Sequence, residues 1–383
     1  SPHRSRFFGY FSLCVTATVG VAMAGNLITF LLFYELLTLA TYPLIVHRGT
    51  EESRRAGQSY LVYTLCCGAA LLLGTVWLYT LTGTLEFTPR GFIHAVGEEH
   101  HLALVIIFIL MIGGLGVKAA LVPLHGWLPQ AMVAPAPVSA LLHAVAVVKA
   151  GVFSVLKVCL FIIGPERLQG LPAAQGLLYL AAATVLLASL VALRQDNLKA
   201  RLAYSTVSQL AYITAGALLA NRAAATGGAM HIATHAMGKI TLFFCAGAIV
   251  VAAHRSEISD MRGLGRQMPV TMAAFFVASL SIIGLPPAGG TWSKWYLMLG
   301  SLDAGQGLLM AVLMLSSLLS IAYLLPIPLR AFQAGSDPGR TPVREAPALS
   351  LLALSMTALA CLWLFFQPQA LYELAASVWL HRK

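Results

Sequence analysis

Charged residues are scarce in this sequence. Asp, Glu, Lys and Arg make up 10% of its 383 residues, whereas about a quarter is usual for a soluble globular chain. This shortage excludes an ordinary soluble domain, and the apolar share of 58% indicates a polytopic membrane protein instead. The net charge of +10 does not indicate a nucleic-acid partner, because the basic residues lie in short stretches between apolar runs.

Motifs for redox cofactors, nucleotides and metals are missing as well. The six cysteines lie in apolar stretches without a metal-ligand spacing, so we interpret them as small buried hydrophobic side chains. There is no glycine-rich phosphate loop and no four-cysteine set. His231 and His235 have the spacing of a zinc-protease helix, but the glutamate between them and a third ligand are lacking. The sequence therefore predicts no cofactor, no metal site and no redox chemistry of its own.

Long apolar runs, by contrast, fill most of the chain. A helix that crosses a bilayer needs about 20 mostly apolar residues, and eleven stretches qualify. They do not alternate as barrel strands would. The prediction is an all-α polytopic membrane protein whose spans cover approximately 7–25, 27–46, 58–82, 102–122, 136–163, 174–193, 203–220, 228–253, 269–297, 306–332 and 347–367.

The basic residues of the connecting segments favour one side of the membrane. The alternate loops hold one Lys or Arg or none, whereas the other set holds three in each of the segments 47–56, 194–202, 254–268 and 330–346. The positive-inside rule places this basic set in the cytoplasm. The chain is therefore predicted to be a multi-pass protein of the bacterial inner membrane. Its last stretch, 369–383, is predicted to be an interfacial amphipathic helix on the opposite face.

Ionisable residues occur at membrane depth in spite of their cost. A charge at the bilayer centre costs about 2.5–3.5 kcal/mol on insertion scales. So many such residues in one chain need partners or water, and they are candidates for an ion or proton pathway. The set comprises Glu35, Lys118, Lys149, Lys157, Lys239, Lys294, His125, His143, His231 and His235.

Three of these residues form a stripe. His231, His235 and Lys239 are each four residues apart and share one side of a helix. Imidazole both donates and accepts hydrogen bonds, so the stripe suits a proton relay, although a polar stripe that only packs against neighbouring helices is an alternative. Other members of the set have simple alternatives too. Lys157 can extend to the interface, and His143 can be an ordinary core residue.

Two of the spans carry helix-breaking residues beside a lysine. Four prolines between Pro123 and Pro137 lie near Lys118 and His125, and the run "GLPPAGGTWSK" leads into Lys294. Proline interrupts a helix, and interruptions at membrane depth often mark ion sites in transporters. The alternative is an ordinary kink, with His125 simply a polar residue at the break. We predict a broken helix at each place.

These residues resemble the antiporter-like proton-translocating family. This family includes the three large membrane subunits of respiratory complex I, related membrane hydrogenase subunits, and the A-type and D-type subunits of Mrp cation/proton antiporters. The resemblance rests on "FYELLTLATYPLIVH", "KAALVPLHGWLPQAMVAPAPVSALLHAVAVVKAG", "DNLKARLAYSTVSQLAY", "HIATHAMGKITLFFCAGAI" and "GLGRQMPVTMAAFFVASLSIIGLPPAGGTWSK". The stretches "HRGTEESRRAGQSYL" and "APAPVSALLHAVAVVKAGVF" look most like the D-type subunit of Mrp antiporters.

The resemblance implies an architecture. Family members have fourteen core helices with two inverted five-helix repeats, so the eleven spans would be the fourth to fourteenth, with the first three missing. The spacing of the two broken helices, five spans apart, fits such a repeat. The whole chain, 1–383, is then one transmembrane domain, with approximate repeat halves 1–163 and 174–332 and C-terminal helices in 333–383.

The resemblance also implies roles for the ionisable residues. Glu35 would pair with Lys118 and tune its protonation, Lys149 would be the central lysine, and Lys294 would be the terminal one. The histidines His125, His143, His231 and His235, together with Lys239, would link these positions as a proton relay.

The resulting prediction is a proton-translocating subunit of a complex I-like or Mrp-like assembly. Protons would be taken up from the cytoplasm, held between Lys149 and Lys239, and released past Lys294. Its partners would be homologous antiporter-like membrane subunits, other subunits of the complex, lipid and protons. Alternatives are the D-type subunit of an Mrp Na⁺/H⁺ antiporter, a non-conducting scaffold or quinone-contacting subunit, and the membrane partner of an inorganic-carbon uptake system. The sequence leaves open whether the driving partner is a redox enzyme or an ion gradient.

Overall fold

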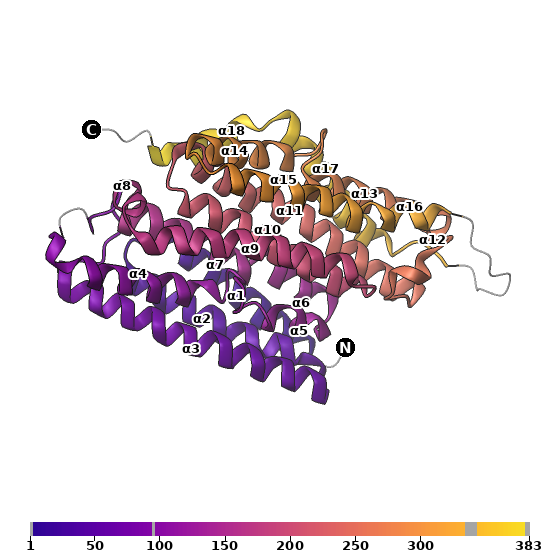
Figure 1. Ribbon diagram of the computed structural model, residues 1–383. Coiled ribbons are helices and arrows are strands. Elements are labelled where there is room, and N and C mark those ends of the chain that lie inside the picture. Colours follow the sequence, from indigo (N-terminus) through magenta and orange to yellow (C-terminus); the bar gives the residue numbers. More distant parts are fainter. Residues whose placement is uncertain (1–2, 94–95, 334–342, 380–383) are drawn as a thin grey trace.

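The chain folds into a bundle of long helices joined by short connections. The computed structural model describes residues 3–93, 96–333 and 343–379, and no β-strand is found in these ranges (Figure 1). Arg340 and residues 380–383, which entered the orientation and interfacial-helix predictions, lie outside the described residues. The first part of the predicted last helix is described, and it forms α18 (Gln369–Ala376).

Within the described ranges, eight helical segments are long and apolar enough to cross a membrane. Four further helices overlap predicted spans but are shorter or more polar: α4 (His101–Gly116), α10 (Leu198–Leu218), α13 (Pro269–Ile283) and α14 (Gly290–Asp303). The all-helical, polytopic prediction is confirmed, whereas the number of crossings is not fixed by length and composition. The eight segments are α1 (Arg4–Met23), α2 with its 3-10 extension (Leu27–Arg48), α3 (Glu51–Thr82), α6 to the π-turn after α7 (Ala136–Ile163), α9 (Pro172–Arg194), α11 (Arg222–Ala253), α15 with α16 (Gly307–Phe332) and α17 (Ala348–Phe366).

The two halves of the bundle share matched features. Asn26 caps α2 by accepting from the Thr29 amide at 2.9 Å, and Asn197 caps α10 by accepting from the Ala200 amide at 3.1 Å. Each asparagine also forms an isolated backbone bridge further along the chain, Asn26 to Glu86 and Asn197 to Glu257. Both bridges span the same number of residues. Such paired features are typical of an internal repeat.

The two predicted interruptions are present. Helix α4 ends at Gly116, and the chain does not regain helical geometry until α5 (Trp127–Gln130). Helix α13 ends at Ile283, and α14 (Gly290–Asp303) begins after the Pro-Pro-Ala-Gly turn. Close packing holds each break in place, because a Cβ on Gly151 would overlap the backbone at Lys118, and one on Gly290 would overlap the backbone at Ser281.

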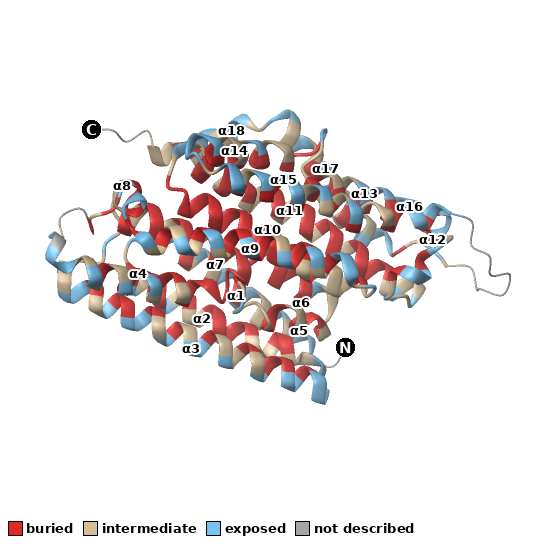
Figure 2. Ribbon diagram, in the orientation of Figure 1, coloured by how far each residue is buried: buried red, intermediate tan, exposed pale blue. Residues whose placement is uncertain are grey.

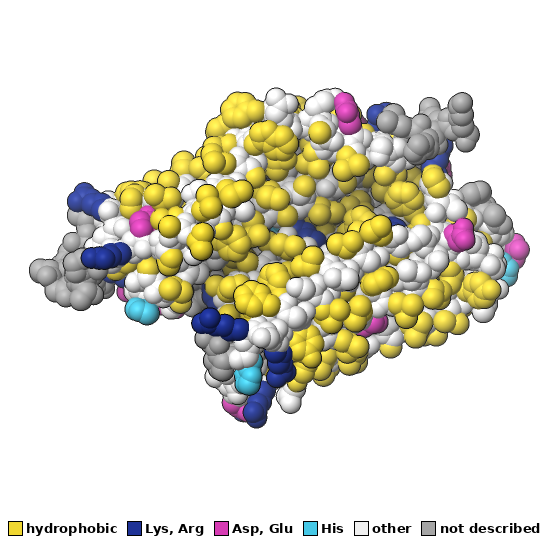
Figure 3. Space-filling view, turned by 180° about the vertical axis from the view of Figure 1, so that it is seen from behind, with side chains coloured by type: hydrophobic (Ala, Val, Ile, Leu, Met, Phe, Trp, Pro, Cys, Tyr) yellow, Lys and Arg dark blue, Asp and Glu magenta, His cyan; other side chains and the backbone are white. Residues whose placement is uncertain are grey.

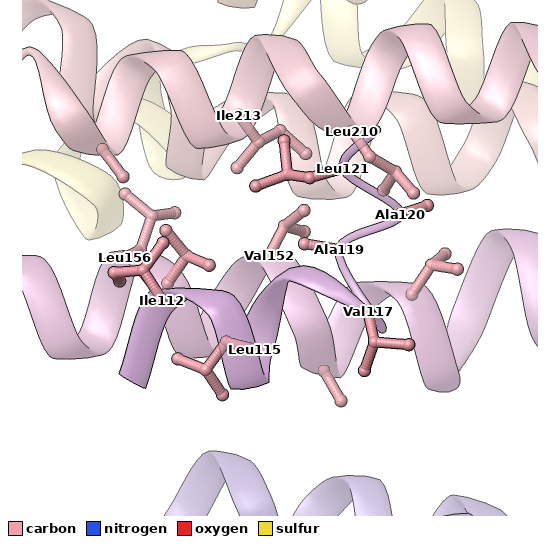
Figure 4. Close-up of a cluster of buried hydrophobic side chains, with 14 of the residues drawn as sticks. Ile112, Leu115, Val117, Ala119, Ala120, Leu121, Val152, Leu156, Leu210 and Ile213 are labelled. Atoms are coloured by element: carbon pink, nitrogen blue, oxygen red, sulfur yellow. The ribbon is translucent and has the colours of Figure 1, made fainter. Parts of the chain in front are cut away.

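Apolar packing surrounds the first break. Side chains from α4, the break itself, α7 (Val147–Val158) and α10 meet in one buried cluster (Figure 4). Buried residues concentrate on α7, α10 and α11, whereas α3 turns much of its surface outward (Figure 2). The outer surface carries many exposed apolar side chains, and in Figure 3 the Lys and Arg side chains lie mainly at the left end and the bottom of the view, with others at the upper right. This distribution suits a bundle surrounded by lipid.

The prediction that all six cysteines are buried is wrong for two of them. Cys66 is exposed and Cys67 is partly exposed, whereas the other four are buried. The reason is that Cys66 lies on the outer side of α3, where Val62 and Leu65 are exposed too. An apolar run that crosses a membrane has a lipid-facing side, so lying within such a run does not decide whether a residue is buried in protein.

Candidate functional site

A lysine and a histidine from two different helices meet at the centre of the bundle. Lys149 lies near the start of α7 and is buried, and its Nζ is in hydrogen-bond contact with Nδ1 of His235 on α11. The other ring nitrogen of His235, Nε2, is buried and has no hydrogen-bond partner among the described residues. The imidazole therefore has one nitrogen on the lysine and one that can pass a proton onward.

The second histidine of the stripe continues from this pair. The ring centroids of His235 and His231 lie 5.8 Å apart. His231 Nδ1 lies 2.8 Å from the Ser293 hydroxyl on α14, and Nε2 lies 3.1 Å from the Gln209 side-chain oxygen on α10. Ser293 is the residue before Lys294. The stripe thus leads from the Lys149 pair to the second broken helix.

Lys239, the third member of the stripe, points to a different neighbour. It is fully buried on α11, and its Nζ donates to the main-chain oxygen of Leu202 at 3.0 Å. His143 lies in a short π-helix (Leu141–Val145) between α6 (Ala136–Ala140) and α7. Its ring lies 4.8 Å from the ring of Phe243 on α11. Both His143 nitrogens are buried without a hydrogen-bond partner among the described residues. Buried polar atoms of this kind are usually satisfied by water.

Lys118 lies in the first break, where it contacts α2. Its Nζ donates to the main-chain oxygen of Tyr34 and lies 3.4 Å from the centroid of the Tyr34 ring. The neighbouring residue, Glu35, is partly buried and turns its carboxylate towards α3, where a Cβ on Gly68 would overlap Oε1. Within the described residues, Glu35 and Lys118 form no direct ion pair, although each lies in the other's electrostatic field.

Lys294 lies in the first turns of α14, directly after the second break. It is buried, and its Nζ donates to the main-chain oxygen of Ile283 at 3.0 Å and to the Ser317 hydroxyl at 3.1 Å. The same Nζ lies 4.6 Å from the centroid of the Tyr212 ring. Main-chain oxygen, hydroxyl and ring all stabilise a cation without carrying a charge.

The two remaining candidates lie aside from this arrangement. The ring of His125, in the first break, lies 6.3 Å from the Tyr204 ring, and its Nδ1 lacks a hydrogen-bond partner among the described residues. Lys157 contacts the main-chain oxygens of Ala22 and Ala24 at the end of α1 and covers the Phe87 ring at 4.2 Å. Lys157 therefore caps a helix end, as lysines near helix C-termini commonly do.

The ionisable groups of the site are mostly basic, with Glu35 as the acidic exception. In the part of the chain that the structure describes, no ion pair joins Lys118, Lys149, Lys239 or Lys294 to an aspartate or glutamate. The ion pairs that do form there, such as Arg90–Glu166, involve exposed side chains. No group of three or more His, Cys, Asp and Glu suited to a metal ion was found in the same residues.

Sequence reasoning missed a network of buried hydroxyl groups beside this site. Ser189 on α9, Ser208 on α10 and Ser316 on α15 (Gly307–Leu324) bring their Oγ atoms within 2.8–3.2 Å of one another. Further hydroxyl contacts lie beside the triad, between Tyr212 and Ser317 at 3.4 Å and between Tyr323 and Ser205 at 3.2 Å. The signal available in the sequence was the run "AYSTVSQLAY" on α10, whose hydroxyl residues recur at helical spacing.

Comparison with known sequences agrees with this architecture. Residues 24–320 match the model of a family described as NADH:quinone oxidoreductase/Mrp antiporter, transmembrane. The chain is 37% identical over 347 residues to NADH-quinone oxidoreductase subunit N of Desulforudis audaxviator, an alignment that covers 89% of this chain and 68% of that relative. It is 34% identical to NAD(P)H-quinone oxidoreductase chain 5 of a Picosynechococcus species, but spans only 45% of the length of that relative.

Solved structures share the fold. A chain of the Mrp complex from a Dietzia species matches with a TM-score of 0.86 and 24% identity, over 96% of this chain and 76% of that one. A chain of respiratory complex I from Thermus thermophilus matches with a TM-score of 0.78 and 27% identity, over 98% of this chain and 82% of that one. Both neighbours are parts of multi-subunit membrane assemblies.

Proposed function

This chain belongs to the NADH:quinone oxidoreductase/Mrp antiporter family, and on that premise we propose that it carries protons across the membrane as one subunit of a larger complex. The carriers would be its buried lysines, Lys118, Lys149, Lys239 and Lys294, and the histidines between them. The driving force would come from other subunits, because nothing in the sequence binds a redox cofactor or a nucleotide.

One observation supports this proposal above the others. The four lysines are buried, yet in the described part of the chain each rests on neutral acceptors, namely main-chain oxygens, a hydroxyl or an imidazole. A buried lysine fixed permanently as a cation would need a carboxylate partner. One that must gain and lose a proton in each cycle needs acceptors that tolerate both of its forms.

The contacts suggest an order for the transfers. Lys149 would exchange a proton with Nδ1 of His235, and His231 would carry it to the Ser293 and Gln209 side, next to Lys294. Water molecules bound at the free nitrogens of His235 and His143 would complete the hydrogen-bonded chain. Lys118, under the influence of Glu35, would set when the central lysine is charged.

Protons suit the site better than sodium ions. Sodium is a hard cation that prefers several oxygen ligands, and Glu35 is the acidic residue of this sequence that lies deep within a span. The groups along the proposed path are mostly nitrogen bases, which bind protons. An Mrp-type exchange of sodium for protons stays a second candidate, because two sequence stretches resemble the D-type subunit of Mrp antiporters and the fold matches a chain of an Mrp complex.

Proton pumping by the assembled complex in inverted membrane vesicles tests the proposal. We expect Lys149→Ala to abolish pumping in sodium-free buffer in a complex that still assembles. Lys157→Ala is the matched control, because Lys157 lies on the same helix but, among the described residues, its Nζ bonds to the end of α1 and lies over the Phe87 and Phe153 rings. Normal pumping by Lys149→Ala would refute the relay and favour a non-conducting scaffold. A loss that appears only with sodium present would favour the Mrp-type exchanger.

A further inference from the structure

We propose that the buried hydroxyl groups between α9, α10 and α15 form a second proton path, which connects the basic end of the bundle directly to Lys294. This inference rests on the proposed function, since it assumes that Lys294 takes part in proton transfer. It adds a second supply of protons to Lys294 and does not replace the transfer through Lys149 and the two histidines. Its members are Ser317, Tyr212, Ser316, Ser208, Ser189, Tyr323, Ser205 and Ser320.

The inner end of this path is Lys294 itself. Lys294 Nζ lies 3.1 Å from the Ser317 hydroxyl, which lies 3.4 Å from the hydroxyl of Tyr212. Tyr212 donates to the main-chain oxygen of Leu313 at 2.7 Å and also lies against Ser316. On this proposal, the Tyr212 hydroxyl turns from Leu313 towards Ser317, and a water molecule or a small shift of the ring joins it to Ser316.

The middle of the path is the serine triad. Ser316 lies 2.8 Å from Ser189 and 3.2 Å from Ser208, and the last two lie 2.9 Å apart. These three side chains come from three different helices and are all fully buried. Hydroxyls in membrane helices often satisfy themselves on the preceding turn of their own helix, as Ser279 does on Phe275. The contacts of Ser189, Ser208 and Ser316 join different helices, so they are not needed merely to satisfy each hydroxyl within its own helix.

The outer end lies beside a surface arginine. The Tyr323 hydroxyl lies near Ser189, 3.2 Å from Ser205 and 2.9 Å from Ser320. Ser205 lies one helical turn from Arg201, and the Arg201 guanidinium donates to the main-chain oxygen of Tyr323 at 3.0 Å. Arg201 is partly exposed and belongs to one of the basic connecting segments.

The direction of the path follows from the helices that carry it. Helix α10 begins within the basic segment 194–202, and α15 continues through α16 (Pro326–Phe332), which ends within the basic segment 330–346. Tyr212 is seven residues further into α10 than Ser205, which is about 10 Å along the axis at 1.5 Å per residue. The path therefore runs inward from the basic, cytoplasmic end.

The chemistry balances with hydroxyl groups alone. A hydroxyl both donates and accepts a hydrogen bond, so each group can take a proton from the outer neighbour and release its own to the inner one. Water at the outer end loses one proton, and the neutral amine of Lys294 gains one and becomes an ammonium. Only O–H and N–H bonds break and form, and the hydroxyls return to their first orientation by rotation.

The test removes single hydroxyls and leaves the rest of each side chain in place. In the assembled complex, we expect Tyr323→Phe and Ser208→Ala to slow proton pumping about fivefold or more, as for the loss of one hydrogen bond in the rate-limiting step. We also expect a larger ratio of the rates in H₂O and D₂O, because proton delivery becomes limiting. Ser279→Ala is the matched control, because Ser279 is a buried serine whose hydroxyl donates to the main-chain oxygen of Phe275 in its own helix.

Three outcomes are informative. Slower pumping with a raised isotope ratio in both variants, at normal assembly and melting temperature, supports the path. Wild-type pumping in both variants, in a system where Lys149→Ala abolishes it, would overturn the path and leave the proposed function intact. Wild-type pumping by both Lys149→Ala and Lys294→Ala would overturn the proposed function, and the path with it, because the path ends on Lys294.

Discussion

The two broken helices have a similar build but different surroundings. Each breaks an apolar helix at membrane depth and holds a buried lysine on main-chain oxygen, Lys118 on Tyr34 and Lys294 on Ile283. Both lysines also lie over an aromatic ring, of Tyr34 and of Tyr212. At the first break, the residue that follows Tyr34 on α2 is Glu35, which adds a carboxylate to the surroundings. In the second, the lysine meets the hydroxyl of Ser317.

This difference separates two tasks that a proton carrier needs. A carboxylate near a lysine changes how readily the lysine holds its charge, because opposite charges stabilise each other. A hydroxyl passes a proton on but leaves the charge balance unchanged. On the proposed function, the first break regulates and the second conducts. A repeated framework can thus acquire different roles by changing only the side chains around its lysines.

The largest expected effect concerns the close packing of a glycine against the main chain, which both breaks share. Gly151→Ala and Gly290→Ala place a methyl group against main chain, at Lys118 and Ser281 respectively, and neither neighbour can rotate away. We expect a loss of stability of about 3 kcal/mol or more, at the upper end of overpacking effects, and failure of the complex to assemble. Melting temperature and yield of the purified complex measure it.

Gly176→Ala is the control for these two variants, because no atom lies within 4 Å of a Cβ at that position. If one break tolerated the methyl group while the other did not, the two would differ in rigidity as well as in chemistry. The contrast between the two breaks would then have a mechanical component.

The next largest effect concerns Lys294, the lysine of the second break. We expect Lys294→Ala to lower proton pumping at least about tenfold, which corresponds to about 1.4 kcal/mol on the barrier, because no other amine lies at the inner end of the hydroxyl path in the described structure. Pumping by a complex with normal assembly measures it. An unchanged rate would mean that Lys294 only fills its break, and the second region would lose its conducting role.

Much of this arrangement was predictable from the sequence, for clear reasons. The length of the apolar runs predicts the helices, and proline with glycine predicts both breaks, since these residues act locally. The stripe of His231, His235 and Lys239 follows from helical spacing alone. Each of these features depends on residues near one another in the chain.

Features that depend on packing between distant segments were not predictable in the same way. Nothing in the sequence pairs Lys149 with His235 in particular, since the contact needs α7 to pack against α11. The carboxylate of Glu35 faces α3 because Gly68 leaves room for it there. The hydroxyl network was missed because single serines in membrane helices usually bond to their own helix, so only the packed structure shows which of them meet.

A smaller effect isolates the regulating role of the first break. We expect Glu35→Gln, which keeps the shape and removes the charge, to slow pumping about threefold to tenfold, within the usual range of a coupling between sites. When Lys118→Ala is already present, Glu35→Gln should not slow pumping any further, because the lysine on which Glu35 acts has been removed. Rates of the single and double variants in vesicles measure this. Independent, additive losses would show that Glu35 acts elsewhere.

The smallest expected effect concerns two tryptophans that support the breaks. The indole N–H of Trp127 donates to the main-chain oxygen of Val117 at 2.8 Å, inside the first break. The indole N–H of Trp292 donates to the main-chain oxygen of Phe365 at 2.9 Å, which ties α14 to α17. We expect Phe at either position to cost about 1 kcal/mol of stability, the usual net value of one hydrogen bond.

The two variants should differ in their effect on transport. Trp127→Phe loosens the loop that carries Lys118, so we expect a modest fall in pumping together with the fall in melting temperature. Trp292→Phe loosens a contact between helices and leaves Lys294 on its own partners, so we expect the melting temperature to fall alone. Equal losses of pumping in both would mean that transport depends on the rigidity of the whole bundle, and not on the local geometry around each lysine.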